Sequence, residues 1–177
     1  MSEHNFFPFP NLQTTHLLLR QVNLIDAPEI FSLRSSELVN KYLDRKPSNS
    51  IEDALVFIQA INENIQKNQS IYWAITLPPS NKLVGTICLF NFSPDQSKAE
   101  MGFELLPPLQ GKGIMMEAAS RIIQYGFGEI GLTSIEATTH PGNVSSRRLL
   151  EKLNFELTFD EAVAGYLLKK NYQAEIK

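Results

Sequence analysis

Two closely spaced glycines are the first feature of this chain that could do chemistry. Gly111 and Gly113 stand one residue apart in the stretch 110–118, after an apolar strand-like run and before an amphipathic helix pattern. The start of a helix carries backbone N–H groups without helical partners, and the helix dipole favours negative charge there. The stretch therefore predicts a binding site for a phosphate or pyrophosphate group.

The spacing of the glycines excludes two common phosphate motifs. In a Walker A loop with Gly111 as the second glycine, Leu106 stands where the first glycine belongs and Gly113 where Ser or Thr is needed. In the dinucleotide fingerprint Gly-x-Gly-x-x-Gly, Met116 takes the third glycine position, and no parallel βαβ repeat surrounds it. The spacing alone still leaves open a glycine-rich helix start that binds no ligand.

Polar side chains on both sides of this stretch are candidates for catalysis. Glu100 and Glu104 have the same strand parity, so they point to one face, where either could act as a general base or be solvated. Asn143 is suited to cap the start of a helix, with Ser146 at the third helical position. Their type and spacing fit both a structural and a functional role.

Cysteine and histidine offer little further chemistry. Cys88 is the only cysteine and has apolar neighbours, which favours a buried core thiol over a nucleophile. His4, His16 and His140 show no metal-ligand spacing with one another or with Cys88. We therefore expect no metal site.

The composition is that of an ordinary globular domain. The net charge of −3 over 177 residues argues against nucleic acid as the main partner, since phosphate-backbone binding needs a basic face. No apolar run approaches the roughly 18 residues of a membrane helix, and the N-terminus lacks the basic region of a secretory signal. We expect a cytoplasmic protein without a membrane partner, and both a monomer and a homodimer remain open.

The hydrophobic pattern changes between the periods of strands and helices along the chain. A single domain is expected over residues 1–177, with 1–15 as a loose lead-in. Three antiparallel strands should precede the glycine pair, because turn sequences separate them. The order β-α-α-β-β-β-α-β-α-β-β indicates an α/β or α+β domain around one central sheet. The expected strands are 16–22, 71–77, 83–91, 98–106, 133–139, 155–159 and 163–170, and the expected helices are 26–38, 51–67, 113–130 and 143–153.

With these elements in place, the sequence resembles the GNAT superfamily of acetyl-CoA-dependent N-acetyltransferases, and within it the RimJ/RimL type. The phosphate loop of that family reads Gln/Arg-x-x-Gly-x-Gly/Ala, and Gln110-Gly111-Lys112-Gly113-Ile114-Met115 matches all but its last position. Further pieces resemble the family in the same order over nearly the whole chain. The resemblance implies a mixed, mostly antiparallel sheet of about seven strands flanked by about four helices. These pieces are 17–20 with 26–27, 73–75, 83–87, 100–103, 143–155 and 165–168.

The resemblance also implies a binding site for acetyl-CoA. Backbone N–H groups of the loop would hold the pyrophosphate, and the strand edge at Phe103, Glu104 and Leu105 would pair with the pantetheine arm. Asn143 and Ser146 would contact the same arm. The implied cofactor-binding residues are Phe103, Glu104, Leu105, Gln110, Gly111, Lys112, Gly113, Ile114, Met115, Asn143 and Ser146.

The implied catalytic residues are Glu100, Glu104 and Ser146. Glu100 matches the position of a general-base glutamate in some members, with Glu104 as the second carboxylate. Ser146 would lie near the leaving sulfur, where it could donate a proton, and Tyr166 is a further candidate donor. An α-amine has a reference pKa near 7.7–8.0, so a fair fraction is neutral without a base.

Three departures from the family pattern bear on the site. Met115 replaces a small residue of the loop, and the segment 155–166 is short on the acceptor side. Asn154 replaces the usual glycine after the last helix. Asn tolerates a positive φ, so Phe155 should still pack on Leu150.

We therefore expect an N-acetyltransferase that moves an acetyl group from acetyl-CoA to a primary amine by direct attack in a ternary complex. The resemblance favours the N-terminal α-amine of a protein, such as a ribosomal protein. Small amines, including polyamines and antibiotics, are an alternative acceptor class, and a non-catalytic acyl-CoA-binding module is a second class of function. An acetyl-cysteine route would require Cys88 in the cleft.

Overall fold

The apolar alternation of residues 71–105 builds the centre of an eight-stranded sheet. Strands β3 (Ile71–Thr76), β4 (Leu83–Phe90) and β5 (Lys98–Leu105) pair antiparallel through the two predicted turns. Successive side chains of a strand point to opposite faces, so each strand supplies one set of residues to each face. β3 and β4 are mostly buried on both sides, and β5 is partly buried.

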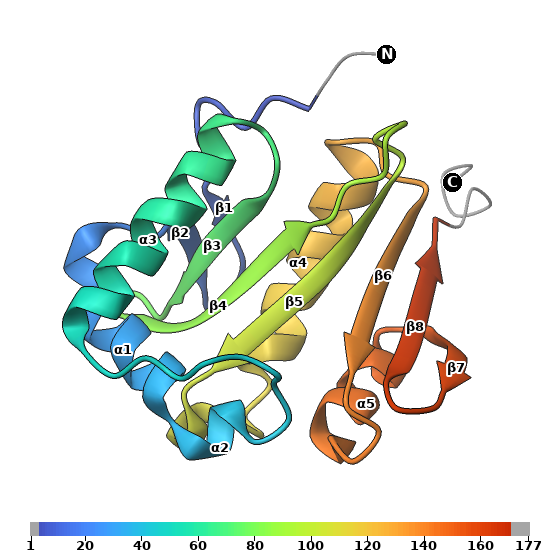
Figure 1. The fold of residues 1–177 in the computed structure, drawn as a ribbon. Helices are drawn as coiled ribbons and strands as arrows, with labels where there is room; N and C mark the ends of the chain where they lie inside the picture. Colours follow the sequence, from blue (N-terminus) through green and yellow to red (C-terminus); the bar gives the residue numbers. More distant parts are fainter. Residues whose placement is uncertain (1–3, 171–177) are drawn as a thin grey trace.

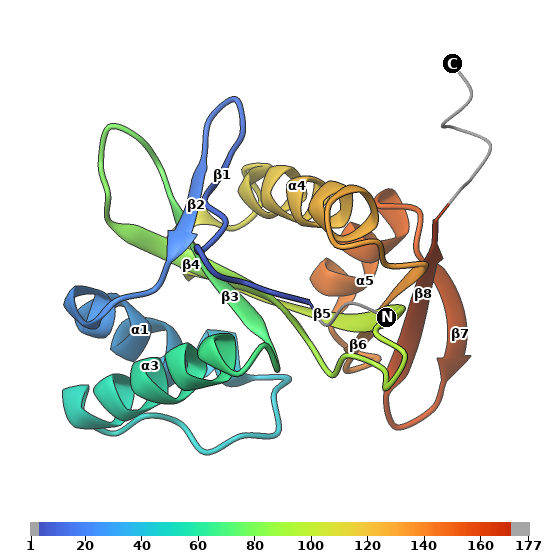
Figure 2. The same ribbon diagram turned by 90° about the horizontal axis from the view of Figure 1, so that it is seen from above.

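The computed structural model describes residues 4–170. The sheet has the order β1-β2-β3-β4-β5-β6-β8-β7 and is mixed but mostly antiparallel, as the resemblance implied. Helices cover both faces, with α1 and α3 on one side and α4 and α5 on the other (Figure 2). The remaining elements are β1 (Leu12–Gln13), β2 (Leu18–Gln21), α1 (Ala27–Ser35), α2 (Glu37–Asn40), α3 (Ile51–Gln66), α4 (Ile114–Gly128), β6 (Ser134–Thr139), α5 (Val144–Lys152), β7 (Glu156–Asp160), β8 (Ala164–Lys169) and two short 3-10 turns at Leu24–Asp26 and Pro107–Leu109.

Two segments differ from the sequence prediction. The segment before residue 16 is not a loose lead-in over its described part, because Phe6 and Leu12 are buried in the core and β1 pairs with β2. This short strand raises the count to eight. The predicted helix 26–38 divides into α1 and α2, because Ser36 is extended and its hydroxyl accepts a hydrogen bond from Val39 N.

The end of α5 confirms the expectation for its last turn. Asn154 adopts the left-handed conformation with φ +66°, and Phe155 N donates to Leu150 O at 2.9 Å. Phe155 and Leu150 are both buried in the main core. The short segment 155–166 is a hairpin in which only residues 161–163 separate β7 from β8.

β5 and β6 are paired over a short length only. They are parallel neighbours, joined through α4, and the pairs run from Lys98↔Ser134 to Glu100↔Glu136. β5 continues to Leu105 and β6 to Thr139, and the two strands diverge beyond the paired part (Figure 1). The sheet is therefore split between its two halves on the side where β5 ends.

A buried ion pair fixes α1 against the first half of the sheet. Arg20 on β2 forms a bidentate pair with Asp26, with both nitrogen–oxygen distances 2.8 Å. Arg20 also donates to the side chain and the carbonyl of Asn81, in the turn before β4. One guanidinium thus ties the start of α1 to two strands. No helix of the described residues is long and apolar enough to cross a membrane.

We predict that Asp26→Ala destabilises the fold strongly, because it leaves the buried Arg20 guanidinium without its charge partner. The expected loss is about 3–5 kcal/mol in the free energy of unfolding, measured by urea denaturation. Arg121→Ala is the control, since it breaks the more exposed Arg121–Glu129 pair and should cost less than about 1 kcal/mol. Equal losses in the two variants would contradict this role of Arg20.

Candidate active site

The edge of β5 that faces β6 offers backbone groups to a ligand. Leu106 N donates to Val84 O on β4 at 3.0 Å, and the β4–β5 register continues this pair to Thr86↔Glu104. In an antiparallel ladder such hydrogen-bonded pairs recur at every second residue. The backbone of Glu104 therefore faces β4, and the backbones of Phe103 and Leu105 face the divergence from β6.

Of the three predicted edge residues, two have the required orientation. Gln110 Nε2 donates to Leu105 O at 3.0 Å, so this carbonyl already has a partner and the N–H groups of Phe103 and Leu105 remain. Glu104 can contribute only its side chain. The sequence prediction counted three consecutive residues of the strand, but only every second backbone faces a given edge.

The predicted phosphate loop has an open backbone. Gly111 and Gly113 have φ +75° and +81°, a conformation that favours glycine, and no atom lies within 4 Å of where a Cβ would be. Gly113 precedes α4, whose start has no side-chain cap. The Met115 side chain is buried in the core, so it points away from the exposed loop. Its replacement of a small residue leaves the backbone of the loop uncovered.

Glu117 anchors this helix start to the N-terminal strands. One carboxylate oxygen accepts hydrogen bonds from Thr14 Oγ1 at 2.6 Å and His16 N at 2.8 Å, and the other lies 3.0 Å from His16 Nδ1. Burial alone would raise the pKa of Glu117, but the hydrogen bonds from Thr14 and His16 outweigh it and lower that pKa. The contacts hold the first turn of α4 in place.

The start of α5 carries the other predicted cofactor contacts. Asn143 Oδ1 accepts from Ser146 N at 3.2 Å, which confirms the capping role. The Ser146 side chain is half-buried, and no hydrogen bond of its hydroxyl is recorded with any of residues 4–170. Tyr166 is less suited to donate a proton to a ligand, because it is buried and its Oη accepts from Arg147 Nε at 3.1 Å.

The two candidate carboxylates share a face of the sheet but have different partners. Glu100 lies in the part where β5 and β6 are paired, and its oxygens accept from Asn91 Nδ2 and Thr138 Oγ1. Glu104 lies in the divergent part and forms an ion pair with Arg45. The arrangement singles out Glu104 as the carboxylate beside the open edge.

Sequence reasoning missed Arg45, which lies in the connection between α2 and α3. This residue stands 59 positions before Glu104, in the charged run 44–46, and nothing in its spacing indicates the contact. Arg34, on α1, stacks over the ring of Phe57 at 3.9 Å. Burial, followed by the nearby charge of Arg45, lowers the pKa of Arg34, and Glu104 opposes this. A polar cluster of Arg34, Arg45 and Glu104 therefore forms on the side of β5 that faces α1.

Cys88 lies under this cluster as a core thiol. Its Sγ is 3.6 Å from Gly102 O, and burial raises its pKa to about 12. Such a thiol is almost wholly protonated at neutral pH and is a poor nucleophile. No group of three His, Cys, Asp or Glu within residues 4–170 could hold a metal ion.

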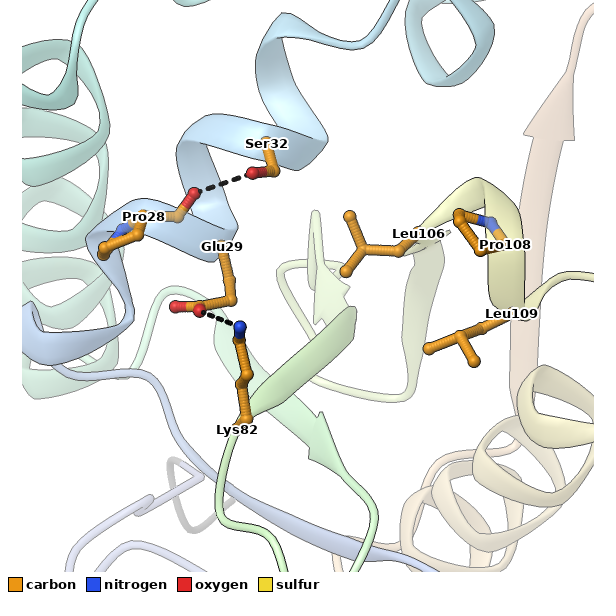
Figure 3. Close-up of a pocket in the computed structure, with 7 residues that line it drawn as sticks. All are labelled: Pro28, Glu29, Ser32, Lys82, Leu106, Pro108 and Leu109. Atoms are coloured by element: carbon orange, nitrogen blue, oxygen red, sulfur yellow. Dashed lines mark hydrogen bonds and ion pairs between the residues drawn. The ribbon is translucent and has the colours of Figure 1, made fainter.

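A separate pocket lies between α1 and the segment that follows β5 (Figure 3). The Glu29–Lys82 ion pair, at 3.3 Å, borders it on one side, and Leu106 and Leu109 border it on the other. None of the predicted site residues lines it. The predicted site instead consists of the edge of β5, the start of α4 and a polar cluster. The side chains of that cluster are Arg34 on α1, Arg45 in the connection between α2 and α3, and Glu104 on β5.

Comparison with known proteins gives consistent matches. Residues 16–156 match the family model described as the acetyltransferase (GNAT) domain. The Bacillus subtilis (strain 168) protein named uncharacterized N-acetyltransferase YoaA is 34% identical over 148 residues, which are 84% of each chain. RimL, a ribosomal L7/L12 alpha-N-protein acetyltransferase solved in complex with coenzyme A, gives a TM-score of 0.81 at 18% identity, over 90% of this chain and 98% of its own. Mycobacterium smegmatis RimJ, with a CoA disulfide, gives 0.77 at 17% identity, over 91% of this chain and 84% of its own. At these identities the solved structures show a common fold.

We predict that Glu117→Gln lowers stability at neutral pH by about 1 kcal/mol, because an amide accepts these hydrogen bonds less strongly than a carboxylate. The folded-state pKa of Glu117 is lowered from its ordinary 4.5. The ionised carboxylate therefore contributes its full stabilisation at pH values above 4.5. This stabilisation is lost as the pH falls through the lowered pKa of the folded state. Thermal denaturation between pH 3.5 and 8 measures the difference. Glu151→Gln, at an exposed helix position, is the control, and a difference between wild type and Glu117→Gln that does not shrink in acid would contradict the assignment.

We also predict that Cys88 in the native protein reacts about a thousandfold more slowly with iodoacetamide at pH 8 than it does after denaturation. The rise in its pKa from 9.0 to about 12 lowers the thiolate fraction by this order. The rate of alkylation in buffer and in guanidinium chloride, followed by mass spectrometry, measures the ratio. Native and denatured rates within tenfold of each other would restore Cys88 as a possible nucleophile.

Proposed function

This chain belongs to the GNAT acetyltransferase family and is an acetyl-CoA-dependent N-acetyltransferase, and we propose that its acceptor is the N-terminal α-amine of a protein. The observation that carries the transferase part is the open edge of β5 directly before an uncapped helix start, and the carboxylate of Glu104 beside that edge supports the amine acceptor. An extended amide-bearing arm can add to such an edge as a strand does, while a pyrophosphate takes the N–H groups at the helix start.

The residues present fit coenzyme A. Leu105 N would hold the pantetheine arm, Phe103 N would face the thioester oxygen, and the backbone from Gly111 to Met115 would hold the pyrophosphate. Both glycines leave space where a side chain would obstruct close approach. Asn143 Nδ2 and the Ser146 hydroxyl would reach the same arm from the start of α5. When bound, acetyl-CoA supplies an activated acetyl group as a thioester.

The residues of the chain assist a direct transfer. Glu104 attracts the amine and takes the proton that the nitrogen loses as it attacks the acetyl carbon. The N–H of Phe103 stabilises charge on the carbonyl oxygen. The carbon–sulfur bond would break, and the Ser146 hydroxyl would donate a proton to the leaving sulfur and regain one from water, while Glu104 would release its proton to solvent. Cys88, with its raised pKa, takes no part, so the amine attacks the thioester without an acetyl-enzyme step.

Two arguments support an α-amine rather than a lysine side chain. An α-amine has a reference pKa of 7.7–8.0, against about 10.4 for lysine, so far more of it is neutral at physiological pH. A single carboxylate in an ion pair can then suffice as the base. RimL, which shares the fold, is named as an alpha-N-protein acetyltransferase.

The test incubates the protein with acetyl-CoA and a panel of N-terminal peptides, peptides with only lysine amines, polyamines and aminoglycosides, and follows thiol release. We expect release with N-terminal peptides and little with the others. Release with polyamines or aminoglycosides alone would overturn the proposed acceptor. Tight binding of acetyl-CoA without release for any acceptor would overturn the proposed reaction.

Two matched variants separate the carboxylates with the best peptide of this panel. Glu104→Gln should lower kcat/KM about a hundredfold, the order expected on loss of a general base. Glu100→Gln makes the same change on the same face and should keep kcat/KM within about threefold. The reverse order would move the base to Glu100, and two unaffected variants would show that no carboxylate of β5 acts as the base.

A further inference from the structure

Arg45 carries a buried nitrogen that has no partner. Its Nη1 pairs with Glu104, and its Nε donates to Asn40 Oδ1 at 2.7 Å. Nη2 is buried and is the single such side-chain nitrogen or oxygen without a hydrogen bond among residues 4–170. A buried donor without an acceptor lowers the stability of the folded state, and such donors are rare in native proteins.

The surroundings of this nitrogen have an excess of positive charge. Arg34 and Arg45 carry two positive charges near the single carboxylate of Glu104. The charge of Arg45 lowers the pKa of Arg34, and the charge of Glu104 raises it. Two further titratable neighbours, Cys88 and Tyr72, are uncharged at physiological pH, because burial raises the pKa of Cys88 to about 12 and that of Tyr72 well above its usual range. An acceptor oxygen with partial negative charge, such as a carbonyl, would satisfy the free donor.

The cluster is reachable from the side opposite the phosphate loop helix. Arg45 belongs to the connection 41–50 between α2 and α3, which passes the end of β5 (Figure 1). Its side chain retains 19% of its exposure, and that of Glu104 retains 13%. The ion pair is therefore partly open to a ligand on this side, and contact with the buried Nη2 requires the Arg45 side chain to shift toward that ligand.

We propose that Arg45 is a specificity-determining residue that binds the first carbonyl oxygen of the acceptor through Nη2, while Glu104 takes the amine. The inference rests on the proposed function and refines its substrate class to an amine with a carbonyl on the adjacent carbon. Covalent geometry places these two atoms roughly 3 Å apart in any peptide N-terminus. One residue of main chain can thus span the neighbouring Nη2 and carboxylate.

The same cluster disfavours polyamines. A polyamine offers no oxygen to Nη2, and its further ammonium groups would lie near Arg34 and Arg45. Like charges in a partly buried site repel strongly. The cluster therefore acts both by attracting the peptide carbonyl and by rejecting polycations.

The test compares one peptide with its analogue in which the first carbonyl oxygen is replaced by sulfur, a weaker hydrogen-bond acceptor that adds no charge to the peptide. Wild type should lose about tenfold to a hundredfold in kcat/KM with the analogue, as expected for a hydrogen bond to a charged group. Arg45→Gln and Arg45→Lys both remove Nη2, and the second keeps the charge; each should show less than about threefold discrimination. Lys46→Gln removes a charge from the next, exposed position and should discriminate as wild type does.

The thermal midpoint of each variant shows whether it is folded, so that a loss of folding is not mistaken for a loss of substrate recognition. If Arg45→Gln does not fold, the comparison is made with Arg45→Lys. Full discrimination in a folded Arg45 variant would overturn the inference while peptide turnover by wild type still supports the proposed function. Wild type that acetylates polyamines and not peptides would overturn both. A merely structural role for Arg45 would lower kcat/KM equally for the peptide and its analogue.

Discussion

The early end of pairing between β5 and β6 is the constraint on which the site depends. The two strands share only three pairs and then diverge. α4 connects them, so its start must lie just after the end of β5, where the sheet has split. An unpaired strand edge and an uncapped helix start thus meet at one place, and both present N–H groups. In this candidate site the backbone would supply most of the donors, so few side chains would be needed.

The two faces of the sheet carry different kinds of residues. On the α4 side, Trp73, Met101 and Leu105 form a dry core against the helix. On the opposite side, the next residues in register place Tyr72 and Glu104 under α1 and the connection after α2. The alternation of a strand therefore puts structural residues on one side of β5 and the candidate acceptor residues on the other.

Much of this was predictable from the sequence, for definite physical reasons. The strands, the main helices and the glycine loop follow from hydrophobic period, turn residues and positive-φ positions, all of which are local. The capping role of Asn143 and the left-handed Asn154 were predictable on the same basis. The lead-in was misjudged, because burial of Phe6 and Leu12 depends on a core formed by residues far along the chain.

The sequence by itself indicated the family, the order of elements and the position of the glycine loop, because each depends on short-range patterns of residue types. Only the tertiary structure decided which backbones of β5 face the split, which carboxylate lies beside the open edge, and that Met115 turns into the core. It alone brought Arg45 to Glu104 across 59 positions. Register, burial and long-range ion pairs arise from packing between distant segments, which no local pattern of residue types records.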